Sequence, residues 1–86
     1  MSYEIEVTRR AEKEILKLDT GMFGRIRAAI DGLGENPRPV GVRKLRGRET
    51  EWRMRVARFR VLYTIEDATR RIVVHRVTDR KDVYRS

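Results

Sequence analysis

The stretch Trp52-Arg53-Met54-Arg55-Val56 alternates apolar and basic side chains residue by residue. A period of two is typical of a β-strand that has one face against a core and the other face open. We therefore expect Trp52, Met54 and Val56 to face the helices and fill the core. Arg53 and Arg55 then emerge together on the opposite, uncovered face of the sheet.

Two longer strand patterns follow this stretch, over residues 59–66 and 71–78. Residues 66–69 are predicted to form the turn between them. A bulge near Ala57-Arg58 would shift the register of the first hairpin, so the face on which Arg60 lies depends on that connection. The three strands predict an antiparallel meander.

The N-terminal half has the pattern of one strand followed by two helices. Residues 3–7 alternate as a half-buried strand, and Thr8 is placed to cap the next helix. That helix is broken at residues 19–21, and a second helix ends at Gly34 and residues 36–39. The apolar stripes of the two helices are Ala11, Ile15 and Leu18 in the first and Phe23, Ile26, Ile30 and Leu33 in the second.

These elements give the order β-α-α-β-β-β, with a further short strand expected over residues 43–46 and closed by Gly47. We expect an α+β fold in which a two-helix hairpin packs on one face of a small antiparallel-rich sheet. No internal repeat divides the 86 residues, so residues 1–86 are predicted to form one domain. The second face of the sheet then stays open.

The net positive charge of the chain comes entirely from its second half. The net charge is +8, and residues 1–41 contribute none of it because they hold equal numbers of basic and acidic residues. Twelve of the fourteen basic residues in residues 42–86 are arginine. Arginine presents a planar fork of donors that suits phosphate and stacks on bases. We therefore expect a polyanion-binding face, with a merely solvated basic surface as the alternative.

Several classes of chemistry lack the residues that they need. The chain has no cysteine, its single histidine is His75, and its only serines are Ser2 and Ser86. We expect no metal, no other cofactor and no serine or cysteine nucleophile, and a structural role for His75. The sequence shows neither a signal pattern nor a membrane span, which predicts a cytoplasmic protein without a membrane partner.

RNA cleavage remains possible with the residues present, because the 2′-hydroxyl can attack its own phosphate. The protein must then align that hydroxyl, stabilise charge on the phosphoryl oxygens and move protons. Arginines suit the second task but are poor bases, since a guanidinium stays protonated. Tyr84 is the candidate for proton transfer or for stacking on a base, and pinning the C-terminal tail to the sheet is its structural alternative.

Four runs resemble the RelE-like toxins of the RelE/ParE superfamily: Lys44-Leu45-Arg46-Gly47, Trp52-Arg53-Met54-Arg55-Val56, Phe59-Arg60-Val61-Leu62-Tyr63 and Asp79-Arg80-Lys81-Asp82-Val83-Tyr84. The resemblance covers nearly the whole chain. It implies the toxin of a type II toxin–antitoxin system, an endoribonuclease that cuts mRNA in the ribosomal decoding site, beside the 16S rRNA. It also implies a cognate antitoxin partner and an active site on the uncovered basic face.

The resemblance assigns roles to individual residues. Arg53 and Arg55 match the two basic strand residues of the family site, and Arg60 matches the arginine that stabilises the transition state. Arg80 matches the tail arginine near the leaving oxygen, and Tyr84 matches the tyrosine that stacks on or helps to activate the nucleotide. Further RNA contacts are expected from Lys44, Arg46, Arg58 and Lys81.

Two features depart from the family pattern. Arg53 and Arg55 stand where some relatives have lysine, and arginine is a poorer general base. Asp79 stands where many relatives have histidine, and its carboxylate is expected to pair with Arg80 and partly cancel its charge, with service as the base itself as the alternative. Both departures concern catalysis more than fold.

Two other functions share the same sequence features. A ParE-like inhibitor of DNA gyrase would keep the fold and cleave no RNA, although it has no need of the arginine and tyrosine set. A plain nucleic-acid-binding module would present the same basic face without chemistry.

Overall fold

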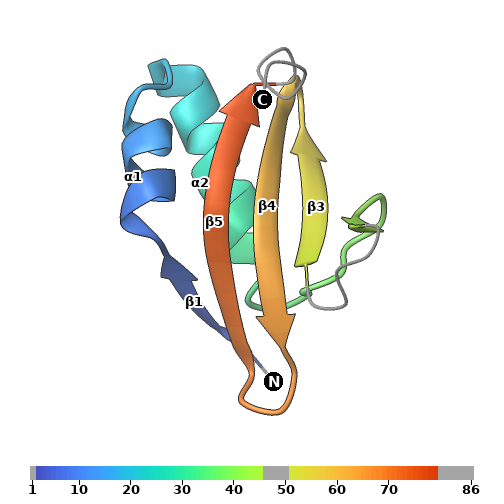
Figure 1. Ribbon diagram of the computed structural model, residues 1–86. Helices are drawn as coiled ribbons and strands as arrows, with labels where there is room; N and C mark the ends of the chain where they lie inside the picture. Colours follow the sequence, from blue (N-terminus) through green and yellow to red (C-terminus); the bar gives the residue numbers. More distant parts are fainter. Residues whose placement is uncertain (1, 46–50, 80–86) are drawn as a thin grey trace.

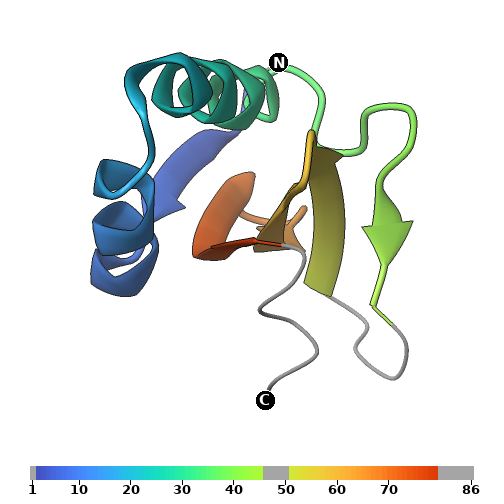
Figure 2. The same cartoon turned by 90° about the horizontal axis from the view of Figure 1, so that it is seen from above.

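The computed structural model describes residues 2–45 and 51–79. Five strands form one sheet in the order β1-β5-β4-β3-β2, and two helices cover one of its faces (Figures 1 and 2). The predicted α+β fold is confirmed. The elements are β1 (Glu4–Val7), α1 (Arg9–Leu16), α2 (Thr20–Gly32), β2 (Arg43–Lys44), β3 (Glu51–Val56), β4 (Phe59–Glu66) and β5 (Arg71–Asp79).

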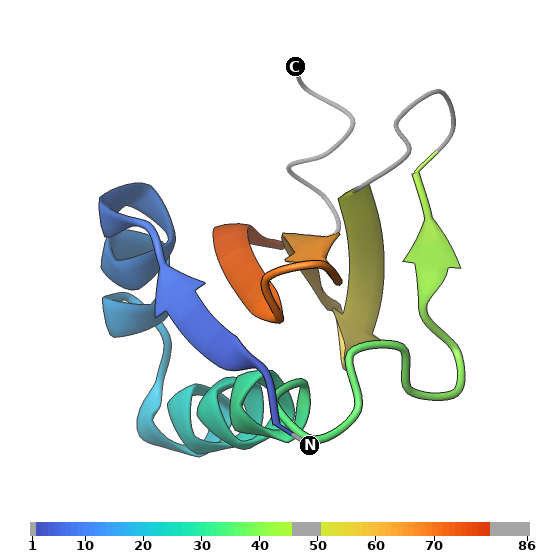
Figure 3. The same cartoon turned by 90° about the horizontal axis from the view of Figure 1, so that it is seen from below.

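The sheet is mixed. Strands β2 to β5 pair antiparallel in chain order, whereas β1 runs parallel to β5, with Glu4 opposite Arg71 and Val7 opposite Val74. A parallel pair needs a long crossover connection, and the two helices are part of it. Figure 3 shows β1 at one side of the sheet and β2 at the other.

Short polar residues begin both helices. The Thr8 hydroxyl accepts a hydrogen bond from the Ala11 amide at 3.2 Å, as the sequence predicts. Asp19 accepts from the Met22 amide at 2.8 Å and thereby caps α2. Residues 19–21, expected to act as a helix breaker, therefore also start the next helix. The second helix ends at Gly32, before the prolines, and Gly34 follows in close contact with the backbone of Tyr3.

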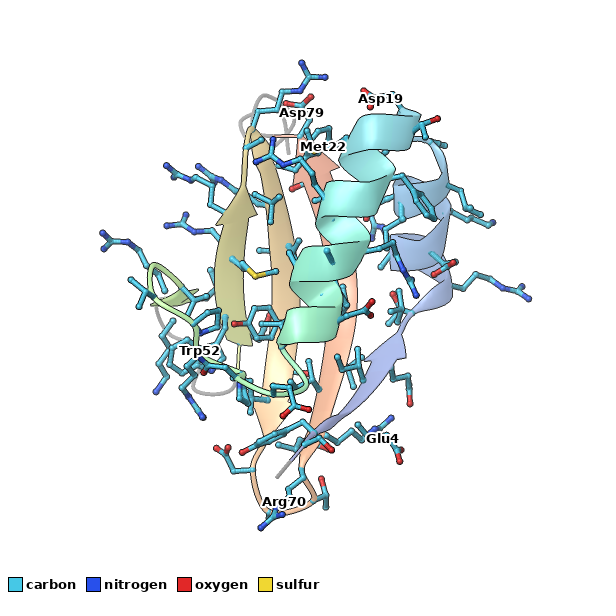
Figure 4. The ribbon with its side chains drawn as sticks, turned by 180° about the vertical axis from the view of Figure 1, so that it is seen from behind. Glu4, Asp19, Met22, Trp52, Arg70 and Asp79 are labelled. Carbon is cyan, nitrogen blue, oxygen red and sulfur yellow. The ribbon has the colours of Figure 1, made fainter. Side chains whose placement is uncertain are left out.

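The core lies between the helices and the covered face of the sheet. Figure 4 shows α2 lying along this face. Met54 is buried on β3, and Trp52 and Val56 pack partly buried against the same core, so the predicted alternation of this strand is confirmed. Phe23 is only partly buried. The buried core residues are Ala11, Ile15, Ile26, Ile30, Leu33, Met54, Phe59, Val61, Tyr63, Ile65, Ile72, Val74 and Val77.

The irregular position of the meander differs from the prediction. Ala57 and Arg58 form a two-residue turn, with Ala57 at φ 53°, and the pairing of Val56 with Phe59 continues the register without a shift. The bulge lies instead between β4 and β5, where the register shifts at Leu62/Tyr63. The extra residue is on β5, because Leu62 pairs with Arg76 and Tyr63 pairs with Val74.

A buried tyrosine joins β4 to the loop after α2. The Tyr63 hydroxyl donates to the Pro37 carbonyl at 2.8 Å, and the side chain is 1 % exposed. Burial raises the pKa of Tyr63 to about 12, because the phenolate would lose its hydration.

This pKa predicts a loss of stability in alkali. Unfolded tyrosine titrates near pH 10 and folded Tyr63 near pH 12, so the free energy of unfolding falls as the pH rises through this window. At pH 11 the expected loss from Tyr63 is about 1.4 kcal/mol, measured by urea unfolding relative to pH 9. The Tyr63→Phe variant should show a smaller fall over the same pH range. An equal fall in both proteins would contradict the prediction.

No helix in the described part of the chain is long and apolar enough to cross a membrane.

Candidate nucleic-acid interface

The uncovered face of the sheet carries two rows of cross-strand neighbours. One row runs from Arg55 on β3 to Arg60 on β4 and Thr78 on β5. The second row pairs Arg43 on β2 with Arg53 on β3. Register partners in a sheet point to the same side, and the rows are two residues, or about 7 Å, apart along the strands. The structure therefore gathers Arg43, Arg53, Arg55 and Arg60 on one surface, here called the basic face.

A hollow of about 410 Å³ lies within the basic face and is lined by Gly41, Arg43, Arg53 and Arg55. Gly41 adopts φ 96°, a left-handed conformation that glycine reaches without strain. The rim of the hollow thus depends on the loop between α2 and β2. A hollow of this size lined by three guanidinium groups suits an anion such as phosphate.

Arg43 is the site residue that sequence reasoning missed. The run from Arg43 to Arg46 was expected to be a strand, but a two-residue strand has no alternation from which its faces can be assigned. Only the pairing of Arg43 with Arg53 places it beside the others. The excess of arginine in this half of the chain was the one available signal.

Part of the basic face lacks counter-charges. Within residues 2–45 and 51–79, neither Arg43, Arg55 nor Arg60 forms an ion pair, and Arg55 and Arg60 are direct cross-strand neighbours. Like charges placed opposite each other in a sheet are destabilising. A polyanion bound across the face would relieve this repulsion.

Of the other six predicted site residues, two lie in the described part of the chain and four do not. Lys44 pairs with Trp52, so its position is on the opposite side of β2 from Arg43 and not on the basic face. Arg58 is in the turn at one end of β3 and β4, where its guanidinium lies 5.3 Å from the Phe59 ring centroid. The remaining four, Arg46, Arg80, Lys81 and Tyr84, lie outside the described residues.

Asp79 binds Arg58. The two side chains form an ion pair at 3.0 Å, in which the Asp79 carboxylate is 14 % exposed and the Arg58 guanidinium is largely in solvent. Figure 4 shows Asp79 at the end of the sheet where α2 begins, near Asp19 and Met22. The predicted pairing of Asp79 with Arg80 lies outside the described residues, and the carboxylate partly neutralises Arg58.

His75 is the extra residue of the bulge on β5. His75 is exposed, and its Nε2 lies 3.1 Å from the Thr64 hydroxyl on β4. In the described part of the chain no group of three His, Cys, Asp or Glu side chains is arranged to hold a metal ion.

A polar cluster fixes the loop that carries Gly41. Arg38 binds Asp67 with two hydrogen bonds of 2.7 and 3.3 Å, and the Tyr3 hydroxyl donates to the same carboxylate at 2.5 Å. These donors lower the pKa of Asp67, and the bond to Asp67 raises the pKa of Tyr3. The Arg38 guanidinium also lies 5.0 Å from the ring centroid of Trp52, so the loop is held both to the turn between β4 and β5 and to β3.

Comparison with known proteins places the chain in a family. Residues 5–84 match the model of a family described as the ParE toxin of type II toxin–antitoxin system, parDE. The candidate toxin RelE1 of Methanocaldococcus jannaschii is 25 % identical over 89 residues, which cover 100 % of this chain and 99 % of that protein.

Solved structures show the same fold. The RelBE2 toxin–antitoxin complex of Mycobacterium tuberculosis contains a chain that matches with a TM-score of 0.81 at 26 % identity, covering 93 % of this chain and 100 % of that one. The archaeal RelE-RelB complex of Pyrococcus horikoshii matches with a TM-score of 0.83 at 24 % identity, covering 93 % and 97 %. The second likeness, at this identity, supports the fold alone.

Proposed function

Since this chain belongs to the ParE toxin family of type II toxin–antitoxin systems, we propose that it is a RelE-like endoribonuclease that cleaves ribosome-bound mRNA and stops translation. The observation that carries the proposal is the pair Arg55 and Arg60, two like charges held side by side on an open face without counter-ions among the described residues. Family membership alone does not choose between the activities of its branches. The arginine row favours a phosphate substrate.

The proposed reaction uses the RNA as its own nucleophile. The 2′-oxygen forms a bond to phosphorus, its proton passes to a base, and the bond to the 5′-oxygen breaks as that oxygen takes a proton. Negative charge grows on the non-bridging oxygens, where Arg55 and Arg60 donate hydrogen bonds. Neither arginine serves as the base, because both stay protonated.

The remaining site residues have proposed roles that follow the family pattern. Arg53 and Arg43 bind the RNA backbone in the hollow beside the reacting phosphate. Arg80 stabilises the leaving oxygen, and Tyr84 stacks on the nucleotide or transfers a proton. Arg46, Arg58 and Lys81 add backbone contacts, as does Lys44 from the other side of the β2 edge.

An antitoxin is the proposed protein partner. The chains of known structure to which this one is similar come from RelBE and RelE-RelB toxin–antitoxin complexes. An acidic and apolar antitoxin segment would neutralise the basic face and compete with RNA, in the cytoplasm where ribosomes translate.

A translation extract tests the proposal. Purified protein added to a reporter mRNA on ribosomes should give discrete mRNA fragments, mapped by primer extension, and the same mRNA without ribosomes should stay largely intact. Intact mRNA in the presence of folded protein would refute the proposed activity.

Gyrase inhibition is the second candidate function, because the matching family model is named for ParE. A supercoiling assay with purified gyrase separates the two activities. A gyrase inhibitor blocks supercoiling and leaves mRNA intact, and a non-catalytic binding module does neither.

A further inference from the structure

Two buried polar atoms lie side by side at one end of the basic-face row. Arg60 and Thr78 are direct cross-strand partners on β4 and β5. The Nε atom of Arg60 and the Oγ1 atom of Thr78 are both buried, and neither has a hydrogen-bond partner. Thr78 is 9 % exposed and is the only buried polar residue of the described part of the chain.

Such a pair needs an explanation, because most buried polar atoms in proteins are hydrogen-bonded. The two atoms do not bond to each other, although the register makes them neighbours. The Arg60 Nε–H is a donor only, and the Thr78 hydroxyl can donate. An oxygen placed between them would satisfy both, and an anionic oxygen would do so best because the guanidinium is charged.

Thr78 belongs to the same row of cross-strand neighbours as two arginines of the basic face. Its row continues through Arg60 to Arg55, so three strands present donors along one line. The acidic neighbour Asp79 is not part of this row, because it pairs with Phe59 and its carboxylate binds Arg58. The carboxylates of Glu14 and Asp79, which line a hollow of about 320 Å³ together with Thr78, already bind Arg76 and Arg58.

We propose that Thr78 is a further substrate-binding residue, whose hydroxyl and the Arg60 Nε–H together hold one non-bridging oxygen of the RNA phosphate at which cleavage occurs. The inference rests on the proposed function for the identity of the phosphate. It rests on the two unsatisfied atoms for the presence of an anion site.

The Thr78→Val variant separates a binding role from a structural one. Valine has nearly the same shape and removes only the hydroxyl. If the hydroxyl is unsatisfied in the free protein, its removal should leave the melting temperature unchanged or raise it. Cleavage of ribosome-bound mRNA should nevertheless fall roughly 10- to 100-fold, the usual effect of losing a hydrogen bond to a charged group. Thr78→Ser keeps the hydroxyl and should retain most activity.

Thr64→Val is the matched control. Thr64 lies on the same face of β4 as Arg60, but it is four residues further along the strand and so is not part of the row of Arg55, Arg60 and Thr78. Its hydroxyl has a hydrogen-bond partner in His75. This variant should cleave mRNA at the wild-type rate and lose a little stability. The two variants should therefore differ in both measurements. Thr64→Val keeps its activity and loses a little stability, whereas Thr78→Val loses activity and keeps its stability.

A second readout does not depend on cleavage. Inorganic phosphate, compared with chloride at equal ionic strength, should raise the melting temperature of the wild type and of Thr78→Ser more than that of Thr78→Val. Wild-type cleavage, wild-type phosphate stabilisation or a clear loss of stability in Thr78→Val would each overturn the proposal. If the wild-type protein leaves mRNA intact, the proposed function fails, and the phosphate measurement alone decides whether Thr78 forms an anion site.

Discussion

The Arg60→Gln variant is expected to cleave ribosome-bound mRNA roughly 100- to 1000-fold more slowly than the wild-type protein. Arg60 lies between Arg55 and Thr78, so it is the central donor of the row that is proposed to bind the phosphate. Its rigid strand holds the guanidinium where charge develops, and glutamine supplies neither the charge nor the fork. Initial rates from primer extension on a defined message measure the effect.

The melting temperature of Arg60→Gln should not fall together with its activity. The Arg60 side chain faces the like charge of Arg55, and its Nε is buried without a partner. Removing the guanidinium relieves both penalties, so the melting temperature should stay level or rise. A functional group retained at the expense of stability behaves in this way.

Arg25→Gln provides the charge-matched control. Arg25 is exposed on α2, in the layer that covers the other face of the sheet. The variant loses the same net charge and should cleave mRNA at the wild-type rate. Equal losses in the two variants would show that overall charge, and not the position of Arg60, determines activity.

Local sequence patterns predicted the strands that carry the basic face. The alternation at Trp52, Met54 and Val56 assigned the sides of β3 correctly, because a period-two pattern with one buried face has only one stable register. The cap at Thr8 and the stripe at Ile26 and Ile30 followed from equally local rules.

Features that depend on pairing between distant segments were not predictable. The bulge at Leu62/Tyr63 lies in the pairing of β4 with β5, which no local pattern marks, whereas the expected bulge near Ala57 rested on the turn sequence alone. Arg43 joins the site only through its pairing with Arg53. Thr78 carries no sequence signal, since an isolated threonine in a strand is ordinary.

One helix residue holds the free edge of β5 next to this site. β1 pairs with β5 only as far as Val74, and beyond it the Val77 amide donates to Glu14 Oε1 at 2.7 Å. The same carboxylate binds Arg76, with Nε at 3.0 Å and the second guanidinium nitrogen at 2.9 Å. Glu14 thus satisfies a backbone donor and a charge that the sheet leaves unpaired.

The Glu14→Ala variant is therefore expected to lose about 3 kcal/mol of unfolding free energy in urea. Alanine leaves the part-buried Val77 amide without its acceptor and removes the counter-charge of Arg76. Glu12→Ala, on the same helix, is the matched control. Its side chain is 46 % exposed and makes one ion pair at 3.7 Å, so it should lose at most about 0.5 kcal/mol. Similar losses in both variants would show that helix charge, and not the edge of β5, is what Glu14 stabilises.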